Sequence, residues 1–396
     1  MPLTPALTVL IAPNPFKGSL SAPEAAHQMA AGMAEAFPEA QFRLVPLADG
    51  GEGTVDCFLA SLGGQRVTRR VRGPLGDEVD AAYALLPDGS AVVEIAAASG
   101  LPLVPPSRRD PMRTTSFGTG QLIRDALDRG ARRFILGLGG SATVDGGIGL
   151  AMALGARFVD LGGWDLSPDG RGLLQVDRLD MSGWDTRLRE STFTVASDVD
   201  NPLLGPQGAA AVFGPQKGAG PEQVALLDAG LARWAGAVRA ALGVDVSSRP
   251  GAGAAGGVGA AAMALFQATV RPGVELVMEA ARFGEYLRQA DLVLTGEGRM
   301  DSQTAYGKGP LGVARRCRAA NVPLVAFAGS VAGREEDFRE MGFDLVVPVV
   351  PGPQTVEEAM ALAGENVRNA ARRLGWALAL GKLVLAKPGE RTGEGK

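Results

Sequence analysis

Short apolar runs that end in glycine-marked loops constrain the fold of this chain more than any other feature. Residues 7–12 form a continuous apolar run, and Ser21, Ala22, Pro23 and Glu24 follow it after a loop. A continuous apolar run is typical of a strand buried on both faces of a parallel sheet. Ser-x-x-Glu is the signature of a helix N-terminus. The pattern predicts a strand–loop–helix unit.

The same unit recurs at both ends of the chain, whereas the middle has wider-spaced strands. Strands are expected at residues 42–47, 291–295, 322–328 and 343–349 near the ends, and at residues 91–95, 133–138, 156–159 and 192–196 in the middle. We therefore predict an α/β fold. A Rossmann-like, doubly wound parallel-sheet domain takes residues 1–65 and 289–386, an inserted α/β domain takes residues 66–288, and residues 387–396 form a flexible tail.

Composition narrows the function to small-molecule chemistry by carboxylates and lysines. A net charge of -4 offers no basic surface for nucleic acid. The single histidine, His27, lies in the first expected helix and excludes a histidine-based triad or metal site. The N-terminal apolar run is too short to span a membrane and lacks a basic leader, so a cytoplasmic protein is predicted.

Two glycine-rich segments resemble nucleotide-binding loops, although no Walker-type motif is present. Residues 251–256 match G-x-G-x-x-G but follow no apolar strand. Residues 137–142, GLGGSA, follow a strand, and Asp160 lies about 20 residues further on, as in a dinucleotide site. The same loop can instead cradle a phosphate on successive N–H groups, with Ser141 as an added donor. A tight turn without a ligand is the third interpretation.

Four acidic loops follow expected strands. Asp49 in ADGGEG is expected either to bind a metal ion or substrate hydroxyl, or to cap the helix predicted from Thr54. Asp198, Glu297 and Asp301 also follow apolar runs. Ligands bind at the carboxyl ends of strands in open α/β sheets, so these acids predict one carboxylate-lined cleft.

Lysines complete this expectation. Lys17 follows the first strand and suits a carboxylate or a phosphate, whereas a solvated surface position is equally open for Lys217 and Lys308.

Seven motifs in order resemble the bacterial glycerate kinase family of the two-domain type. They are APNPFKGSLSAPEAA, PLADGGEGTVD, GLGGSATVDGGIG, SDVDNPLLGPQGAA, FGPQKGA, PGAGAAGG and TGEGRMDSQTAYGKGP. The resemblance implies ATP- and Mg²⁺-dependent phosphorylation of D-glycerate in an interdomain cleft, with 2-phosphoglycerate slightly favoured over 3-phosphoglycerate. It leaves homo-oligomerisation open. The family's motif positions fall on Lys17, Ser19, Asp49, Gly50, Gly51, Gly139, Gly140, Ser141, Asp145, Asp198, Asn201, Glu297 and Asp301.

The roles expected from this resemblance divide the residues into four groups. Asp198 is the base and Lys17 binds an anionic group, both being catalytic. Ser19, Asp49, Gly50, Gly51 and Asn201 bind the substrate. Gly139, Gly140, Ser141 and Asp145 bind the ATP phosphates. Glu297 and Asp301 bind Mg²⁺.

The chain departs from the family pattern at Asn14, Pro15 and Val144, which replace Asp, Ser and Asn. Two alternatives remain: an NAD(P)-dependent dehydrogenase of a small hydroxy acid, which GLGGSA and Asp160 suggest, and a metabolite-binding protein without catalysis.

Overall fold

The computed structural model describes residues 7–301 and 309–385 and divides the chain into two compact α/β units. Unit 1 combines both chain ends, Met1–Ala48 and Val277–Lys396, and unit 2 is Asp49–Leu276. The sequence placed these boundaries at 65/66 and 288/289, so both differ from the observed ones. The expected tail, residues 387–396, lies outside the described residues.

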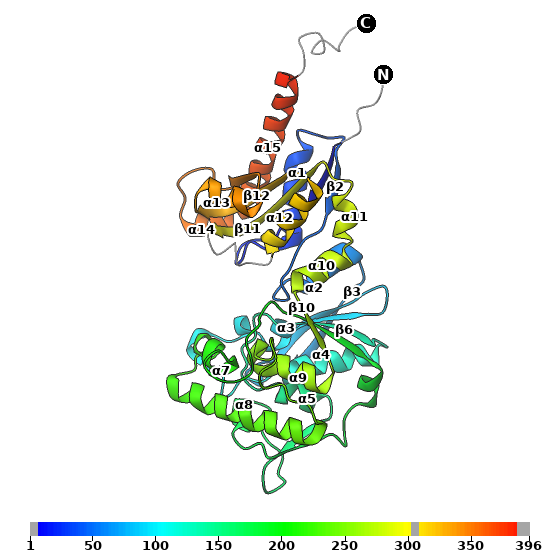
Figure 1. Ribbon diagram of the computed structural model, residues 1–396, viewed down its shortest axis with the longest axis vertical. Helices are drawn as coiled ribbons and strands as arrows, with labels where there is room; N and C mark the ends of the chain where they lie inside the picture. The colour runs from blue at the N-terminus through cyan, green and yellow to red at the C-terminus, as the bar shows by residue number, and fades with distance from the viewer. Residues whose placement is uncertain (1–6, 302–308, 386–396) are drawn as a thin grey trace. The chain divides into compact units, whose positions relative to one another are not determined.

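Unit 1 contains a five-stranded parallel sheet (Figure 1). Its strands are β1 (Thr8–Ile11), β2 (Gln41–Leu44), β11 (Leu292–Asp301), β12 (Leu324–Ala332) and β13 (Leu345–Pro348). The order β13-β12-β11-β1-β2 places the point where the strand order reverses between β1 and β11. Doubly wound sheets of this kind bind ligands at the carboxyl ends of the strands beside that point. The predicted doubly wound sheet is confirmed.

Helices cover both faces of this sheet. Met29 and Met33 on α1 (Ala22–Ala34) pack with Val367 on α15 (Ala363–Leu385), in a cluster that also contains Val9 and Ile11. Because side chains alternate along a strand, the residue between these two strand positions faces the opposite side. On that side α12 (Gly309–Ala320) contacts β11 and β12, and α13 (Glu335–Met341) contacts β13.

Local sequence signals place several helix ends correctly. Ser21 caps α1 and Thr355 caps α14 (Val356–Ala361), each through the expected capping box. His27 is exposed on α1, and its Nδ1 lies 2.7 Å from the Pro23 carbonyl oxygen. The expected position of this histidine in the first helix is confirmed.

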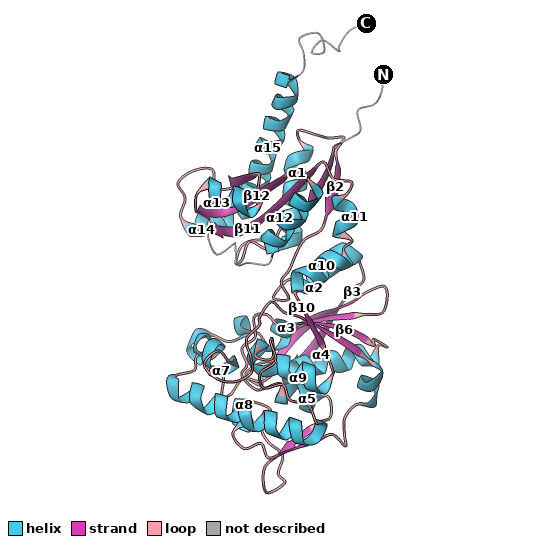
Figure 2. Cartoon of the chain, viewed as in Figure 1, coloured by secondary structure: helices cyan, strands magenta, loops and turns pink. Residues whose placement is uncertain are grey.

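Unit 2 contains a six-stranded mixed sheet (Figure 2). Its strands are β3 (Gln65–Arg72), β4 (Glu78–Leu85), β5 (Ala91–Glu94), β6 (Arg133–Gly137), β9 (Thr192–Ala196) and β10 (Thr269–Arg271), in the order β10-β9-β6-β5-β4-β3. Strands β5, β6, β9 and β10 run parallel to one another, whereas β4 pairs antiparallel with both β3 and β5. The carboxyl ends of these four parallel strands therefore lie at one edge of the sheet.

The remaining helices lie mostly in unit 2. They are α2 (Thr54–Leu62), α3 (Ile95–Ser99), α4 (Phe117–Asp128), α5 (Ile148–Ala153), α6 (Gly170–Leu173), α7 (Ala209–Phe213), α8 (Pro221–Leu242), α9 (Val258–Leu265), α10 (Gly273–Ala280) and α11 (Phe283–Leu287), with short 3₁₀ turns η1 (Leu101–Leu103), η2 (Pro106–Arg108), η3 (Thr186–Glu190), η4 (Pro215–Lys217) and η5 (Ala254–Gly257).

Helix α2 explains why the first boundary falls earlier than the sequence suggested. Its buried side chains include Val55, Cys57 and Phe58, and the helix contacts β4 and β5 of unit 2. The strand–loop–helix pattern of residues 42–62 looked like a continuation of the first sheet. The helix packs instead on the second sheet, which only its tertiary neighbours decide.

The dinucleotide interpretation fails on the geometry of Asp160. Strand β7 (Arg157–Val159) pairs antiparallel with β8 (Arg178–Asp180) in a separate two-stranded sheet, not beside β6. The Asp160 Oδ1 accepts hydrogen bonds from the N–H groups of Gly162 and Trp164, both at 2.9 Å. This carboxylate therefore closes a local turn and does not follow a neighbouring parallel strand.

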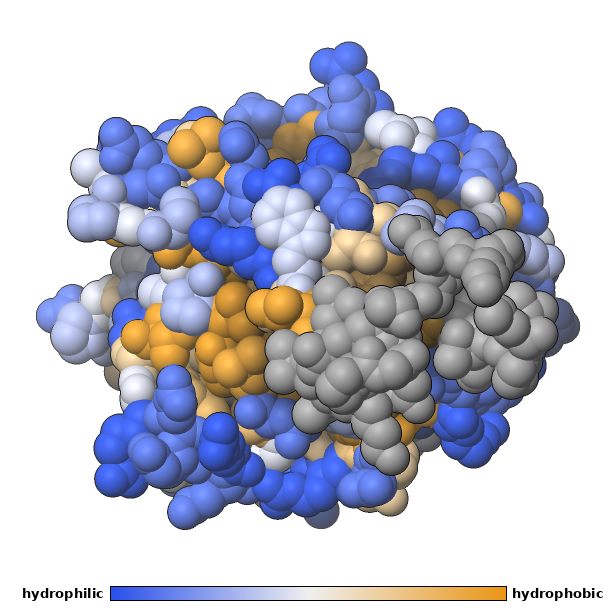
Figure 3. All heavy atoms as spheres, turned by 90° about the horizontal axis from the view of Figure 1, so that it is seen from above, coloured by the Kyte–Doolittle hydropathy of each residue, from blue (hydrophilic) through white to orange (hydrophobic). Residues whose placement is uncertain are grey.

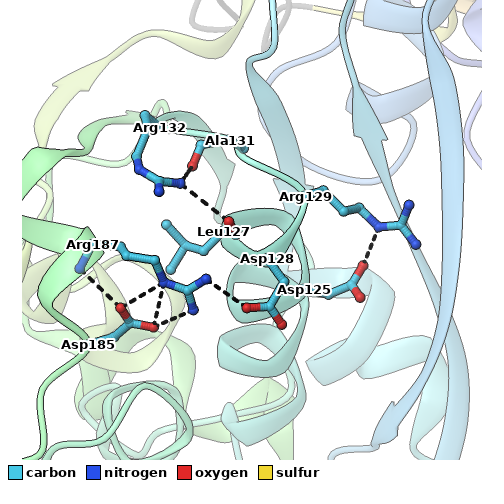
Figure 4. A network of polar contacts seen from close by, with 8 residues as sticks. All are labelled: Asp125, Leu127, Asp128, Arg129, Ala131, Arg132, Asp185 and Arg187. Atoms are coloured by element: carbon cyan, nitrogen blue, oxygen red, sulfur yellow. Dashed lines mark hydrogen bonds and ion pairs between the residues drawn. The ribbon is translucent and has the colours of Figure 1, made fainter.

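A charged network holds the end of α4 at the amino end of β6 (Figure 4). Arg187 lies between Asp185 and Asp128, donating at 2.7 Å to each. Asp125 accepts from Arg129 at 2.9 Å and from the Tyr83 hydroxyl at 2.7 Å. These contacts stabilise the edge of the sheet opposite to the one where β6 ends.

Polar side chains dominate the face seen in Figure 3, with a patch of apolar ones among them. Among the residues of α15 whose burial is described, the exposed large apolar side chains are Trp376, Leu378 and Leu380. None of the helices in residues 7–301 and 309–385 combines the length and apolar character that crossing a bilayer requires.

Candidate functional site

Three loops meet at the carboxyl edge of the unit 2 sheet, namely the Asp49 loop and the loops that follow β6 and β9. The Asp49 loop, residues 49–53, contacts the ends of β6 and β9. The Gly139 N–H donates to the Gly50 carbonyl oxygen at 3.0 Å. Gly50 has φ +90°, and a Cβ on it would lie 2.2 Å from the Ala196 carbonyl oxygen. Glycine is therefore required for this loop to approach β9 so closely.

Asp49 presents an exposed carboxylate at this edge. Its Oδ1 accepts the N–H of Gly51 at 3.0 Å. Helix α2 begins at Thr54 with Gly53 as its N-cap and without a side-chain cap from that residue. The alternative expectation, in which Asp49 caps the helix, is therefore wrong. The carboxylate is left to face solvent or a ligand.

Glu94, which the sequence reasoning missed, holds the start of α2. It ends β5, is 7 % exposed, and its Oε1 accepts the N–H of Val55. Burial raises the pKa of Glu94 to about 7, against the lowering effect of hydrogen bonds from the Val55 and Gly53 N–H groups. The signal in the sequence was an acid directly at the end of the apolar run AVVE. Glu94 therefore holds the end of the Asp49 loop by accepting hydrogen bonds from the N–H groups at the start of α2.

Glu94→Gln is expected to remove a pH-dependent part of the stability. Because the folded protein holds the Glu94 proton more tightly than the unfolded chain, this group favours folding fully below pH 4.5 and loses that contribution towards about pH 7. The unfolding free energy of the variant minus that of the wild type should therefore rise across this range and then level off. Urea unfolding followed by circular dichroism measures it. A difference that does not vary with pH would contradict the assignment.

The Gly139 loop, residues 139–141, uses one of its N–H groups within the protein, whereas the other two have no backbone acceptor among the described residues. The Gly139 N–H is used by Gly50, and Gly140 is exposed with φ +76°. Among the backbone hydrogen bonds of the described residues, none uses the N–H groups of Gly140 or Ser141. These two groups, with the Ser141 hydroxyl, are the donors available to an anion. Gly139 contributes close packing instead.

Lys217 is buried beneath this loop, so the solvated position left open for it is wrong. The side chain is 2 % exposed. Its Nζ donates to Ser141 Oγ at 2.8 Å and to the Thr143 carbonyl oxygen at 2.7 Å. Lys308, the other lysine with an open assignment, lies outside the described residues.

Asp145 is completely buried and supports the segment that follows the Gly139 loop. Its Oδ2 accepts from the Ser116 N–H at 2.8 Å and hydroxyl at 2.7 Å, and its Oδ1 accepts from the Gly147 N–H at 3.0 Å. Burial raises the pKa of Asp145, while these hydrogen bonds lower it. The carboxylate therefore faces protein donors in this structure.

Asp198 and Asn201 follow β9 beside the Asp49 loop. Asp198 is half-buried two residues after Ala196, the residue that Gly50 contacts. Asn201 donates through Nδ2 to the Gln207 carbonyl oxygen at 2.9 Å, and its own carbonyl accepts the Gly253 N–H at 2.9 Å.

The glycine-rich segment 251–257 packs against the site loops, because Gly253 donates to the Asn201 carbonyl oxygen. It is therefore not a dinucleotide-binding motif. On its other side Gly256 lies against Thr143, where a Cβ would come within 2.0 Å of the carbonyl oxygen.

Lys17 and Ser19 lie in unit 1, after β1 and next to the point where the strand order reverses. Lys17 is exposed, and the Ser19 hydroxyl donates to the Phe16 carbonyl oxygen at 3.0 Å. A Cβ on Gly298 would lie 3.5 Å from the Lys17 backbone nitrogen, so the β1 loop and β11 are neighbours. The Asn14 amide lies against Gly309 at the start of α12.

Glu297 and Asp301 lie within a strand and not in the loop expected after residue 295. Strand β11 continues to Asp301 because it stays paired with β12, with Glu297 opposite Ala328 and Asp301 opposite Ala332. Asp301 accepts from Arg299 Nε at 2.9 Å. The four-residue spacing puts both acids on one face, with Cα atoms about 13 Å apart.

Comparison with known proteins identifies the family of this chain. The chain matches the profile of the glycerate kinase family over residues 9–379. It is 45% identical to the glycerate kinase of Bacillus subtilis over 96% of this chain and 99% of that one. It is 44% identical to the glycerate 2-kinase of Escherichia coli over 95% and 99%.

A solved structure also matches. A crystal structure from Salmonella typhimurium LT2, of a protein provisionally assigned as glycerate kinase 2, superimposes with a TM-score of 0.85 at 48% identity, covering 95% of this chain and 99% of that one. The chain therefore belongs to the glycerate kinase family and is a phosphotransferase that acts on an alcohol group.

Proposed function

We propose that the protein phosphorylates D-glycerate with ATP, and that 2-phosphoglycerate is the product. One observation carries the chemistry: an exposed carboxylate at Asp49, available N–H donors at Gly140 and Ser141, and Asp198 come together at one sheet edge. Acids suit a hydroxylated substrate and N–H groups suit a phosphate. The full-length similarity to glycerate kinases supports the substrate.

The proposed roles follow the positions of these groups. Asp198 takes the proton of the attacking hydroxyl, and Asp49, held by Gly50 and Gly51, binds a substrate hydroxyl. The Gly140 and Ser141 donors bind phosphate oxygens and neutralise the charge that develops there. Asp145 is assigned to loop positioning because its carboxylate is fully engaged by Ser116 and Gly147.

The remaining site residues have proposed roles that follow from their side-chain types. Lys17, exposed after β1, suits an anionic group of a substrate or nucleotide. Ser19 and Asn201 are proposed substrate contacts; Ser19 Oγ retains acceptor capacity, since its proton is donated to Phe16.

The residues present fit a magnesium ion that arrives with the nucleotide. Among the described residues no three His, Cys, Asp or Glu side chains gather in a metal-binding group. Mg²⁺ is usually held by one or two carboxylates together with substrate phosphates, and Glu297 and Asp301 are the proposed carboxylates. Because about 13 Å separates their Cα atoms along β11, one of them is expected to be the direct ligand. When bound, Mg²⁺ would neutralise phosphate charge.

Incubation of the purified protein with ATP, Mg²⁺ and D-glycerate is expected to release ADP. Phosphorus NMR of the product then distinguishes the 2-phosphate from the 3-phosphate. Formation of 3-phosphoglycerate would overturn the regiochemistry alone. Absence of ADP would overturn the proposed activity, and the dehydrogenase alternative would need NADH formation with a hydroxy acid. A cytoplasmic location, an interdomain reaction site and homo-oligomerisation remain predictions from the sequence.

A further inference from the structure

Lys217 is a buried lysine in a chain that contains few lysines. Lysine occurs at six positions of this chain, against 33 arginines among the 39 basic residues. Lys217 ends the 3₁₀ turn η4, is 2 % exposed and is joined to both ends of the segment 141–143, which directly follows Gly140. Burying a charged ammonium is costly unless it is paired, so a purely structural filler would be expected to be apolar.

The two hydrogen bonds determine what the Ser141 hydroxyl can do. An ammonium group has three donors and no acceptor. Ser141 Oγ must therefore accept the 2.8 Å hydrogen bond from Nζ. The Ser141 proton is consequently left to donate in another direction, on a loop whose Gly140 is exposed. An uncharged amine could instead accept this proton and remove the donor.

We propose that Lys217 is a positioning residue that holds the Gly139 loop in its anion-binding conformation and keeps the Ser141 hydroxyl as a donor to a nucleotide phosphate. This inference rests on the proposed function, because it assigns ATP to that loop. Lys217 acts through Ser141 and Thr143 and has no direct contact with the substrate in this assignment.

The charges around Lys217 support the proposal. Burial lowers the pKa of Lys217 to about 7, and the nearby Asp145 carboxylate opposes this shift. On its other side Gly218 packs on the backbone of Arg109, whose side chain is half-buried. A phosphate bound to the Gly139 loop adds negative charge close to the ammonium and stabilises its protonated form. Nucleotide binding near pH 7 should therefore be accompanied by proton uptake at Lys217.

The test measures binding of a non-hydrolysable ATP analogue with Mg²⁺ to the full chain by titration calorimetry. Lys217→Met and Ser141→Ala are each expected to weaken binding about tenfold or more. The double variant should bind no more weakly than Lys217→Met. Calorimetry in buffers of different ionisation enthalpy should show less proton uptake in Lys217→Met than in the wild type. The KM for D-glycerate should change little in all three variants.

Tyr83→Phe is the matched control, since it removes a partly buried hydrogen bond of 2.7 Å to Asp125 at the opposite edge of the same sheet. It should lower the melting temperature without changing nucleotide affinity. Losses that multiply in the double variant, or unchanged nucleotide binding by Ser141→Ala, would overturn the positioning role. The second result decides the matter even if Lys217→Met fails to fold. A wild type that binds the analogue but does not phosphorylate D-glycerate would overturn only the proposed function.

Discussion

Asp198→Asn is expected to lower kcat by about two or more orders of magnitude with the fold intact. Asparagine has the shape of aspartate but cannot accept the proton of an attacking hydroxyl. Asp198 follows β9 two residues after Ala196, which contacts Gly50 of the Asp49 loop, so its chain position is close to the loop that is proposed to hold the substrate. Steady-state kinetics with D-glycerate measures the effect, and circular dichroism checks the fold.

Asp200→Asn provides the matched control for Asp198. Asp200 lies in the same loop, is exposed, and has no proposed role. Its variant should keep kcat within about twofold, since surface substitutions of this kind have small effects. Near-normal turnover by Asp198→Asn would remove Asp198 as the base. An equal loss in both variants would point to the conformation of the loop instead.

Gly50→Ala is expected to lower the unfolding free energy by about 2–5 kcal/mol and to abolish most of the activity. Two costs add at this position. The backbone has φ +90°, which side chains with a Cβ rarely adopt, and the new Cβ would lie 2.2 Å from the Ala196 carbonyl oxygen. Because the contact is with backbone, relief requires the Asp49 loop to move away from β9. Asp49 would move with it.

Gly89→Ala separates these two costs. Gly89 has φ +79°, but apart from Gly89 itself and its two chain neighbours no heavy atom of the described residues lies within 4 Å of the position that a Cβ would take. Its variant therefore carries the conformational cost alone, about 1–2 kcal/mol. Urea unfolding of both variants gives the comparison. Equal losses would show that the close approach of Gly50 to β9 does not limit stability.

Elements with strong local signals could be predicted from the sequence. The apolar runs predicted the strands around Val9 and Phe193, and the capping boxes at Ser21 and Thr355 predicted two helix starts. These signals are local because a strand buried on both faces must be apolar throughout and a helix N-terminus needs an acceptor for its free N–H groups. Long-range packing was not needed to find them.

Other features depended on neighbours that are distant in the chain. Strand β11 continues through Glu297 to Asp301 because β12 remains beside it, although the apolar run has already ended. The apolar run before Glu94 does not show which groups its carboxylate meets, and Lys217 is a single charged residue whose burial no local pattern indicates. Their environments are created by the start of α2 and by the Gly139 loop, which lie 39 and 76 residues away at Val55 and Ser141.

The sequence alone determined the α/β class, the loops that carry acids and glycines, and the family resemblance, because each is written in short stretches of residue types. Only the tertiary structure decided which residues of those loops are used for packing and which remain available to a ligand. It showed that Gly139 gives its N–H to Gly50, that Asp145 is enclosed and that Lys217 lies beneath Ser141. The physical reason is that a hydrogen bond or a buried charge is a property of two partners, and the chain order does not specify which partners meet.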